Sequence, residues 1–191
     1  MEELTLSDSN PSHSEDCPRF QREVVDILSN SWPAYRLRDR LWDQYLTFRE
    51  RLTLAESVRR VGRLVLEFGY RSSQTATILD RDDEDTREWV EGPQGRAFVS
   101  ELERARWTQC SLLELDKLIF EQFGALARES TDRQALQLVC HATLSFVPGA
   151  GRNLDEILDA DEGPVGDWAV EESNKLWKHV FGESTPLATV K

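Results

Sequence analysis

The stretch "TLAESVRRVGRLVLEFGYRSSQTA", residues 53–76, decides the fold. Its apolar residues repeat at spacings of four, three, four and three, the period of an α-helix with one apolar face: Leu54, Val58, Val61, Val65 and Phe68. Thr53, followed three positions later by Glu56, matches a capping box. Gly69 stands where a left-handed C-terminal cap belongs, and Ser72 or Ser73 is placed to cap a following short helix. The stretch therefore predicts two helices joined by a tight turn.

Helical periodicity continues on both sides of this stretch. Amphipathic patterns occupy residues 20–32, 34–48, 83–91, 96–106, 111–126, 131–147 and 167–181, with a shorter one at 153–158. The sequence "PGAG", residues 148–151, is expected to stop the helix before it. No strand-like alternation of useful length is present, so we expect an all-α fold.

The expected architecture is a compact bundle of about six to eight helices, with a helix-turn-helix in its N-terminal half. Residues 19–182 are predicted to form a single helical domain. Within it, 19–92 would be a DNA-binding half and 93–182 a helical half for oligomerisation or interaction. Residues 1–18 and 183–191 are polar or frayed and are expected to be disordered tails.

Composition places the chain among globular proteins: 191 residues, 39% hydrophobic and 30% charged, with a formal net charge of −12. No run of about 18 apolar residues occurs, so no membrane span and no membrane partner are expected. The N-terminus carries acids where a signal peptide needs a basic start, which predicts an intracellular, cytoplasmic protein. Cys17, Cys110 and Cys140 form no CxxC motif. Neither a disulfide framework nor a structural zinc site is therefore expected.

The charge is unevenly distributed along the chain. Residues 1–18 carry five acids and no base, residues 19–71 carry 11 arginines against seven acids, and residues 72–191 carry 12 bases against 23 acids. A basic segment in an acidic chain points to contact with a polyanion. Alternatively, the arginines of 19–71 pair internally with the acidic remainder. The sequence leaves both interpretations open.

No residue pattern indicates catalysis. His13, His141 and His179 have no ligand or base at helical spacing that would mark a metal site or a catalytic triad. Serine elbows and phosphate-binding loops are absent. We therefore expect no catalytic residues, no cofactor and no metal, and a protein that is not an enzyme.

The acidic run at residues 80–91 has two interpretations. Its carboxylates fall at several ligand positions of a calcium-binding loop, but Asp85 stands where that loop requires glycine. A helix N-terminus capped by Asp82 or Asp83, with acids in its first turn, explains the same residues.

One constellation suggests a family. "GYRSSQTA", residues 69–76, combines a GY turn with an S…TA helix start, and "EGPQGRAFVSELERARWTQ", residues 91–109, precedes the long helical pattern "SLLELDKLIFEQFGALA", residues 111–127. In this order the segments resemble small terminase subunits of tailed phages, over about residues 52–128. The resemblance implies a DNA-recognition subunit of a genome-packaging machine, a homo-oligomer that works with a large ATPase subunit.

A helix-turn-helix places its second helix in the major groove of duplex DNA. We expect phosphate contacts from four residues, Arg59, Arg60, Arg63 and Arg71, and contacts to base edges from three, Gln74, Thr75 and Thr77. The acids that follow at 80–85 repel a phosphate backbone, so binding is expected to be weak and steeply salt-dependent.

A second hypothesis belongs to another class. The net charge of −12, the six tryptophans and the absence of catalytic groups suit an acidic all-helical protein–protein interaction module, such as an adaptor, inhibitor or regulatory subunit. Such a module has no nucleic-acid role.

Overall fold

The computed structural model describes residues 33–72, 74–80, 82–107, 112–159 and 164–182, and within these ranges it confirms the all-α class. The chain divides into two compact units, residues 1–31 and 32–191. The first unit lies outside the described residues, and so do the helix expected at 20–32 and both predicted tails. The bundle described below belongs to the second unit.

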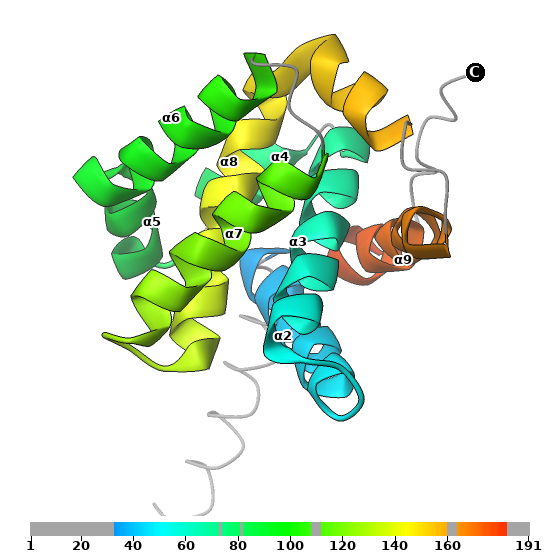
Figure 1. Cartoon of the computed structure of the whole chain (residues 1–191), viewed down its shortest axis with the longest axis horizontal. Coiled ribbons are helices and arrows are strands. Elements are labelled where there is room, and N and C mark those ends of the chain that lie inside the picture. The colour runs from blue at the N-terminus through cyan, green and yellow to red at the C-terminus, as the bar shows by residue number, and fades with distance from the viewer. Residues whose placement is uncertain (1–32, 73, 81, 108–111, 160–163, 183–191) are drawn as a thin grey trace, which may run out of the picture. The chain divides into compact units, whose positions relative to one another are not determined.

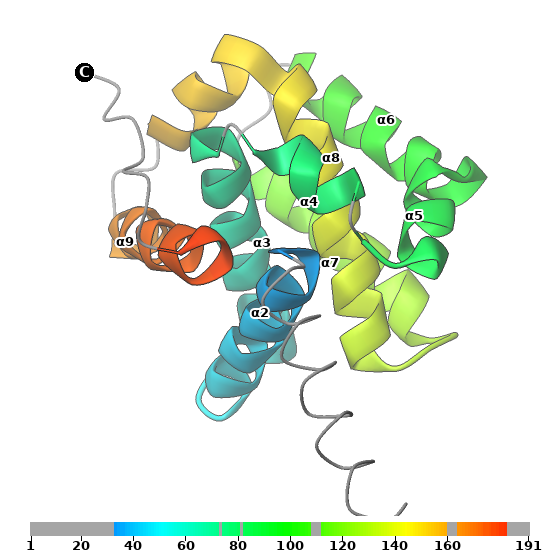
Figure 2. The same ribbon diagram turned by 180° about the vertical axis from the view of Figure 1, so that it is seen from behind.

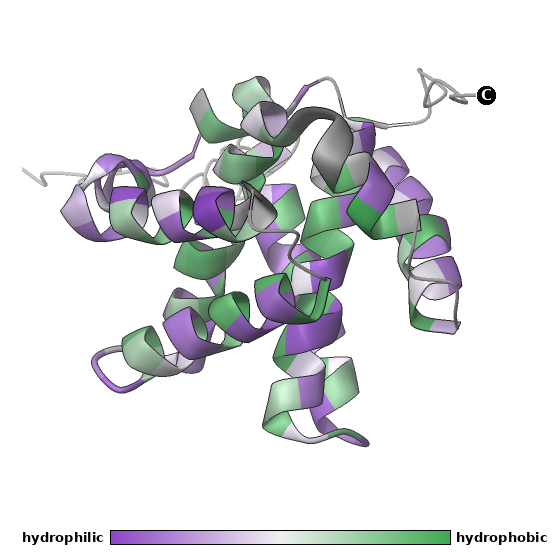
Figure 3. Cartoon of the chain, turned by 45° about the horizontal axis from the view of Figure 1, so that its top comes forward, coloured by the Kyte–Doolittle hydropathy of each residue, from purple (hydrophilic) through white to green (hydrophobic). Residues whose placement is uncertain are grey.

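Eight helices follow one another in the described residues: α2 (Pro33–Arg49), α3 (Leu54–Arg71), α4 (Thr75–Asp80), α5 (Glu84–Glu91), α6 (Pro93–Trp107), α7 (Leu112–Ala127), α8 (Asp132–Asp159) and α9 (Pro164–Phe181). No helix among them is long and apolar enough to cross a membrane. Each helix carries both apolar and polar residues, as amphipathic packing requires (Figure 3).

Helix α3 is the centre of the bundle. It packs against α2, α7, α8 and α9, while α5 and α6 lie on the far side of α8 (Figures 1 and 2). Residues 57, 58 and 61–69 of α3 are all buried. The apolar stripe predicted for this helix is confirmed from Val58 to Phe68, whereas Leu54, at its N-terminal end, is 38% exposed. Thr53 is the N-cap, as the capping box predicted, because its side chain accepts from the backbone N–H of Glu56.

Gly69 does not cap α3, and that expectation is wrong. The helix runs through Gly69 to Arg71, and Ser72 is the C-cap with an extended backbone. Gly69 is instead required by close packing, because a Cβ atom at this position would lie 3.0 Å from both Leu144 Cδ1 and Val147 Cγ2 of α8. The absence of a side chain lets the two helices approach at this point.

Helix α8 continues through the sequence that was expected to stop it. Pro148 lies inside the helix, where it removes one backbone hydrogen bond and costs about 3 kcal/mol. The helix changes direction between its yellow and orange parts in Figure 1, as proline in a helix interior often causes. The turns after the proline bury Ala150, Leu154 and Leu158 against the core, and this burial offsets the cost.

A buried ion pair lies inside α3. Arg63 and Glu67 are one helical turn apart, with side chains 1% and 3% exposed and a closest N–O distance of 3.4 Å. Arg63 Nη2 also donates to the backbone carbonyl of Leu158 in α8 at 3.3 Å, and Arg71 Nε donates to Glu67 Oε2 at 3.3 Å. Arg63 was expected to contact DNA phosphates, a role that needs an exposed side chain, and its burial inside α3 does not suit that role.

The position of Gly69 yields a stability prediction. Gly69→Ala gains helix propensity but overlaps Leu144 and Val147, so we expect a net loss of about 1–2 kcal/mol in the free energy of unfolding. Gly124→Ala is the control, because a Cβ atom there meets nothing within 4 Å, and it should gain up to about 1 kcal/mol. Urea unfolding measures both variants. A Gly69→Ala protein as stable as Gly124→Ala would contradict the packing role.

Candidate functional site

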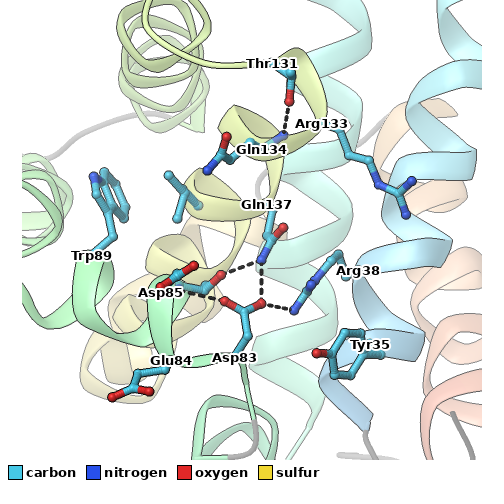
Figure 4. A pocket seen from close by; sticks show the side chains of 12 residues that line it. Tyr35, Arg38, Asp83, Glu84, Asp85, Trp89, Thr131, Arg133, Gln134 and Gln137 are labelled. Atoms are coloured by element: carbon cyan, nitrogen blue, oxygen red, sulfur yellow. Dashed lines mark hydrogen bonds and ion pairs between the residues drawn. The ribbon is translucent and has the colours of Figure 1, made fainter. Parts of the chain in front are cut away.

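A hollow of about 630 Å³ opens between α2, α5 and the N-terminal part of α8 (Figure 4). We call it the α2–α5–α8 pocket, and its principal lining residues are Tyr35, Arg38, Asp83, Trp89 and Gln137. Figure 4 shows Trp89 and Tyr35 on opposite sides, with Asp83 and Gln137 between them. It is a concave surface with aromatic and polar walls, the kind of surface that binding sites use.

A hydrogen-bond network forms the floor of this pocket. Asp83 is the N-cap of α5, and its Oδ1 accepts from the backbone N–H of Thr86 at 2.8 Å. Its Oδ2 accepts from Arg38 of α2 and, at 3.0 Å, from Gln137 Nε2 of α8, which also donates to the hydroxyl of Thr86. One carboxylate thus joins three helices, and the prediction that an aspartate caps α5 is confirmed at Asp83.

Burial opposes ionisation of Asp83, but the hydrogen bonds from Thr86 and the nearby charge of Arg38 outweigh it. Together they hold the pKa of the Asp83 carboxyl below its usual value. Asp83 is therefore a carboxylate at neutral pH.

A second carboxylate lies directly behind Asp83. Asp82 Oδ1 accepts from Arg38 Nη2 at 2.7 Å, and Asp82 Oδ2 contacts Nδ1 of His141 in α8. The side chains of Asp82 and His141 are each 1% exposed. An Asp–His pair is part of many catalytic triads. This one is closed from solvent, so its role in the described structure is to join α2, the α4–α5 connection and α8.

The charges around the pocket are not balanced. Its two bases are already engaged, because Arg38 pairs with Asp82 and Asp83, and Arg133 pairs with Asp39 at 3.0 Å. Glu84 and Asp85 of the first turn of α5 are exposed and make no ion pair within the described residues. The mouth of the pocket therefore carries unneutralised negative charge.

Trp89 stands between this pocket and a second hollow. The second hollow, about 460 Å³, is lined by Asp85, Glu88, Trp89, Gly92, Pro93 and Gln94. The indole Nε1 of Trp89 donates to Gln94 Oε1 at 3.1 Å, which fixes the ring. Trp89 and Asp85 line both hollows, so a bound group on either side contacts the same aromatic residue and carboxylate.

The structure places most of the arginines expected to contact DNA in internal interactions. Arg59 Nε donates to Asp116 Oδ2 of α7 at 2.8 Å. Arg63 is buried with Glu67, which also accepts from Arg71. Arg60 is partly buried, with its guanidinium carbon 5.7 Å from the ring centre of Phe48. These contacts correspond to the internal pairing that the sequence left open as an alternative.

The residues expected to read base edges are divided between the interior and the surface. Thr75 is 3% exposed, and its hydroxyl donates to the backbone carbonyl of Ser72 at 3.0 Å. Gln74, directly before α4, and Thr77, in its first turn, are half-buried. Since Arg63 and Thr75 lie in the interior, the seven residues do not form one exposed surface.

The remaining candidate chemistry is also placed by the fold. Glu84, Glu88 and Glu91 lie in helix α5, so the acidic run is a helix start and not a loop around calcium. Among the described residues, no group of three or more His, Cys, Asp or Glu side chains is arranged to hold a metal. Burial raises the pKa of the Cys140 thiol to about 12, so it is not a nucleophile at neutral pH.

Little in the sequence indicated the Arg38–Asp82–His141 cluster. Arg38 and Asp82 are 44 positions apart, and His141 lies in an apolar helical pattern. No helical or strand period relates residues at such separations. A faint signal was His141, an imidazole within the apolar helical pattern at residues 131–147, because a buried polar side chain needs a polar partner.

No protein-family model matches the chain, and no characterised protein or solved structure is significantly similar to it. The resemblance to small terminase subunits at residues 52–128 stays a prediction.

The Asp83 network yields a pH prediction. Asp83→Asn keeps a capping side chain but removes the charge, so we expect a loss of about 1–2 kcal/mol in the free energy of unfolding at neutral pH. Because the folded-state pKa lies below the unfolded value, the stability from the charge is complete above about pH 4 and is lost as pH falls through the folded-state pKa.

Urea unfolding at neutral pH and at several pH values below about 4 tests this, with Glu101→Gln on exposed α6 surface as the control. The difference in free energy of unfolding between wild type and Asp83→Asn should become smaller as the pH falls. A difference that stays constant with pH would show that the charge of Asp83 does not stabilise the fold.

Proposed function

We propose that the chain is a non-enzymatic protein–protein interaction module and that the α2–α5–α8 pocket receives a segment of its partner. The observation that supports this most is the pocket itself: about 630 Å³, open to solvent, with Trp89 and Tyr35 in its walls. Tryptophan and tyrosine are enriched among the residues that dominate binding energy at interfaces.

The rigidity of the pocket also supports this proposal. Its floor is fixed by hydrogen bonds among Asp83, Thr86, Gln137 and Arg38, so the surface is largely formed before a partner arrives. A preformed surface avoids much of the entropy cost of ordering side chains on binding.

Recognition of duplex DNA, in the manner of a small terminase subunit, is the second proposal. Its support is that Gln74, the last residue of the three-residue connection between α3 and α4, and Thr77, in the first turn of α4, are partly accessible. The internal pairs of Arg59 and Arg71 reduce the charge available for phosphate. Oligomerisation and a large ATPase partner belong to this second proposal.

A blocked pocket tests the first proposal. Gln134 is exposed at the mouth, so Gln134→Trp fills the hollow without changing the core. Glu121→Trp, on the exposed face of α7, is the matched control. We expect immobilised wild type and Glu121→Trp to capture the same protein from cell extract. Gln134→Trp should capture at least about tenfold less of that protein, because the occluded site cannot accept the partner segment.

Fluorescence anisotropy with labelled duplex DNA, at about 50 mM salt, separates the two proposals. The first predicts no DNA binding and a pocket-dependent protein partner. DNA binding that is lost in Gln74→Ala/Thr77→Ala and kept in Gln134→Trp would contradict the first proposal and support the second.

A further inference from the structure

The geometry points to a cation-binding position at Trp89: the guanidinium of a partner arginine stacks on the indole and pairs with Asp85 and Glu88. This inference rests on the proposed function and names the chemistry of the partner, an arginine-containing protein segment. Asp85 and Glu88 are four and one positions before Trp89 on α5, so Asp85 lies one helical turn from the ring on the same face.

The first support is the fixed aromatic surface. Trp89 lines hollows of about 630 and 460 Å³, and the hydrogen bond from its Nε1 to Gln94 holds the ring between them. A tryptophan ring is the strongest aromatic partner for a cation, and arginine is the cation most often found over such rings. A ring already held in position loses little conformational entropy when a guanidinium stacks on it.

The second support is the charge of the lining. The described residues that line the smaller hollow include two carboxylates, Asp85 and Glu88, and no basic side chain. Both side chains are exposed, and neither makes an ion pair within the described residues. A guanidinium on the indole is then close to carboxylates that accept hydrogen bonds from its N–H groups. Arginine can pair with one carboxylate through two parallel hydrogen bonds.

An anionic ligand is disfavoured by the same arrangement. The bases among the described lining residues of the larger hollow, Arg38 and Arg133, lie across it from Trp89 and already pair with Asp82, Asp83 and Asp39. A phosphate or an acidic peptide would meet Glu84 and Asp85 at the mouth, and the bases in the described lining are engaged and cannot offset the repulsion. The occupant that complements the site is cationic.

The larger hollow explains why the ligand is a segment and not a free amino acid. It continues from Trp89 past Gln137 and Gln134 to Tyr35, and the exposed side chain of Gln134 offers an amide group to a peptide backbone. An arginine at Trp89 would thus anchor a chain that runs along the α2–α5–α8 pocket.

The test uses the full chain and three fluorescein-labelled peptides of equal length. Glycine alternates with arginine in the first peptide, with lysine in the second and with citrulline in the third. Citrulline keeps the shape of arginine and lacks its charge. Anisotropy should show the arginine peptide binding at least about tenfold more tightly than the citrulline peptide, with lysine between them, because stacking and bidentate pairing need the guanidinium. The arginine peptide should also shift the NMR signal of the Trp89 indole N–H, assigned with Trp89→Phe.

The variants are Asp85→Asn/Glu88→Gln and its charge-matched control Glu114→Gln/Glu121→Gln, on the exposed face of α7. Asp85→Asn/Glu88→Gln should lower the affinity for the arginine peptide about tenfold or more, and the control should lower it less than about twofold. Both variants lose the same number of negative charges, so general attraction to an acidic protein falls equally in the two. Equal binding of arginine and citrulline peptides, no binding of either, or equal loss in both variants would overturn the inference.

These results are distinct from a failure of the proposed function. A protein partner that is lost in Gln134→Trp, together with no preference for the arginine peptide, would overturn the cationic occupant and leave the interaction module standing. Arginine-peptide binding at Trp89 without any pocket-dependent protein partner would overturn the interaction module and leave the cation-binding position standing.

Discussion

The structure depends on a central helix that is enclosed on nearly every side and still contains two opposite charges. Helix α3 packs against four other helices, and Arg63 and Glu67 lie within it at 1% and 3% side-chain exposure. Moving a charge into a protein interior costs several kcal/mol unless it is paired and hydrogen-bonded. Arg63 meets this condition with Glu67 and with the carbonyl of Leu158, so the position of α8 beyond Pro148 is coupled to the pairing inside α3.

That coupling extends to the candidate site through α8. Its last turns are held by Arg63 through Leu158, and its first residue, Asp132, accepts a hydrogen bond from Tyr45 of α2 at 3.0 Å. Between these ends, α8 presents Gln137 to Asp83 and His141 to Asp82. The floor of the pocket therefore depends on the position of one long helix, α8, and the pocket opens where α2, α5 and α8 meet.

The helices were largely predictable because their apolar residues recur with a helical period, as Val58, Val61 and Val65 do in α3. The errors have specific causes. Gly69 and Pro148 have local preferences for ending helices, and tertiary packing overrode both: Gly69 allows contact with Leu144 and Val147, and burial of Leu154 and Leu158 offsets the proline. Arg63 was misplaced because periodicity describes the apolar face and cannot tell whether the opposite face is also covered.

The candidate site was less predictable than the helices. Asp83 was foreseen as a helix cap, a local property, whereas its contacts with Arg38 and Gln137 join residues 45 and 54 positions apart. Trp89 belongs to the amphipathic pattern at residues 83–91, which predicts only a contact with the core. Its position between two hollows depends on how α5 lies against α6 and α8, and no residue spacing within α5 encodes that arrangement.

The most direct test of the central claim is the free energy of unfolding in urea of Glu67→Gln, compared with Glu121→Gln. Glu67 is paired inside α3, and Glu121 is paired with Lys117 on the surface, where both side chains are more than half exposed. We predict a loss of about 3 kcal/mol or more for Glu67→Gln, because Arg63 keeps its buried charge, and less than about 1 kcal/mol for Glu121→Gln. Equal small losses in the two variants would contradict the account.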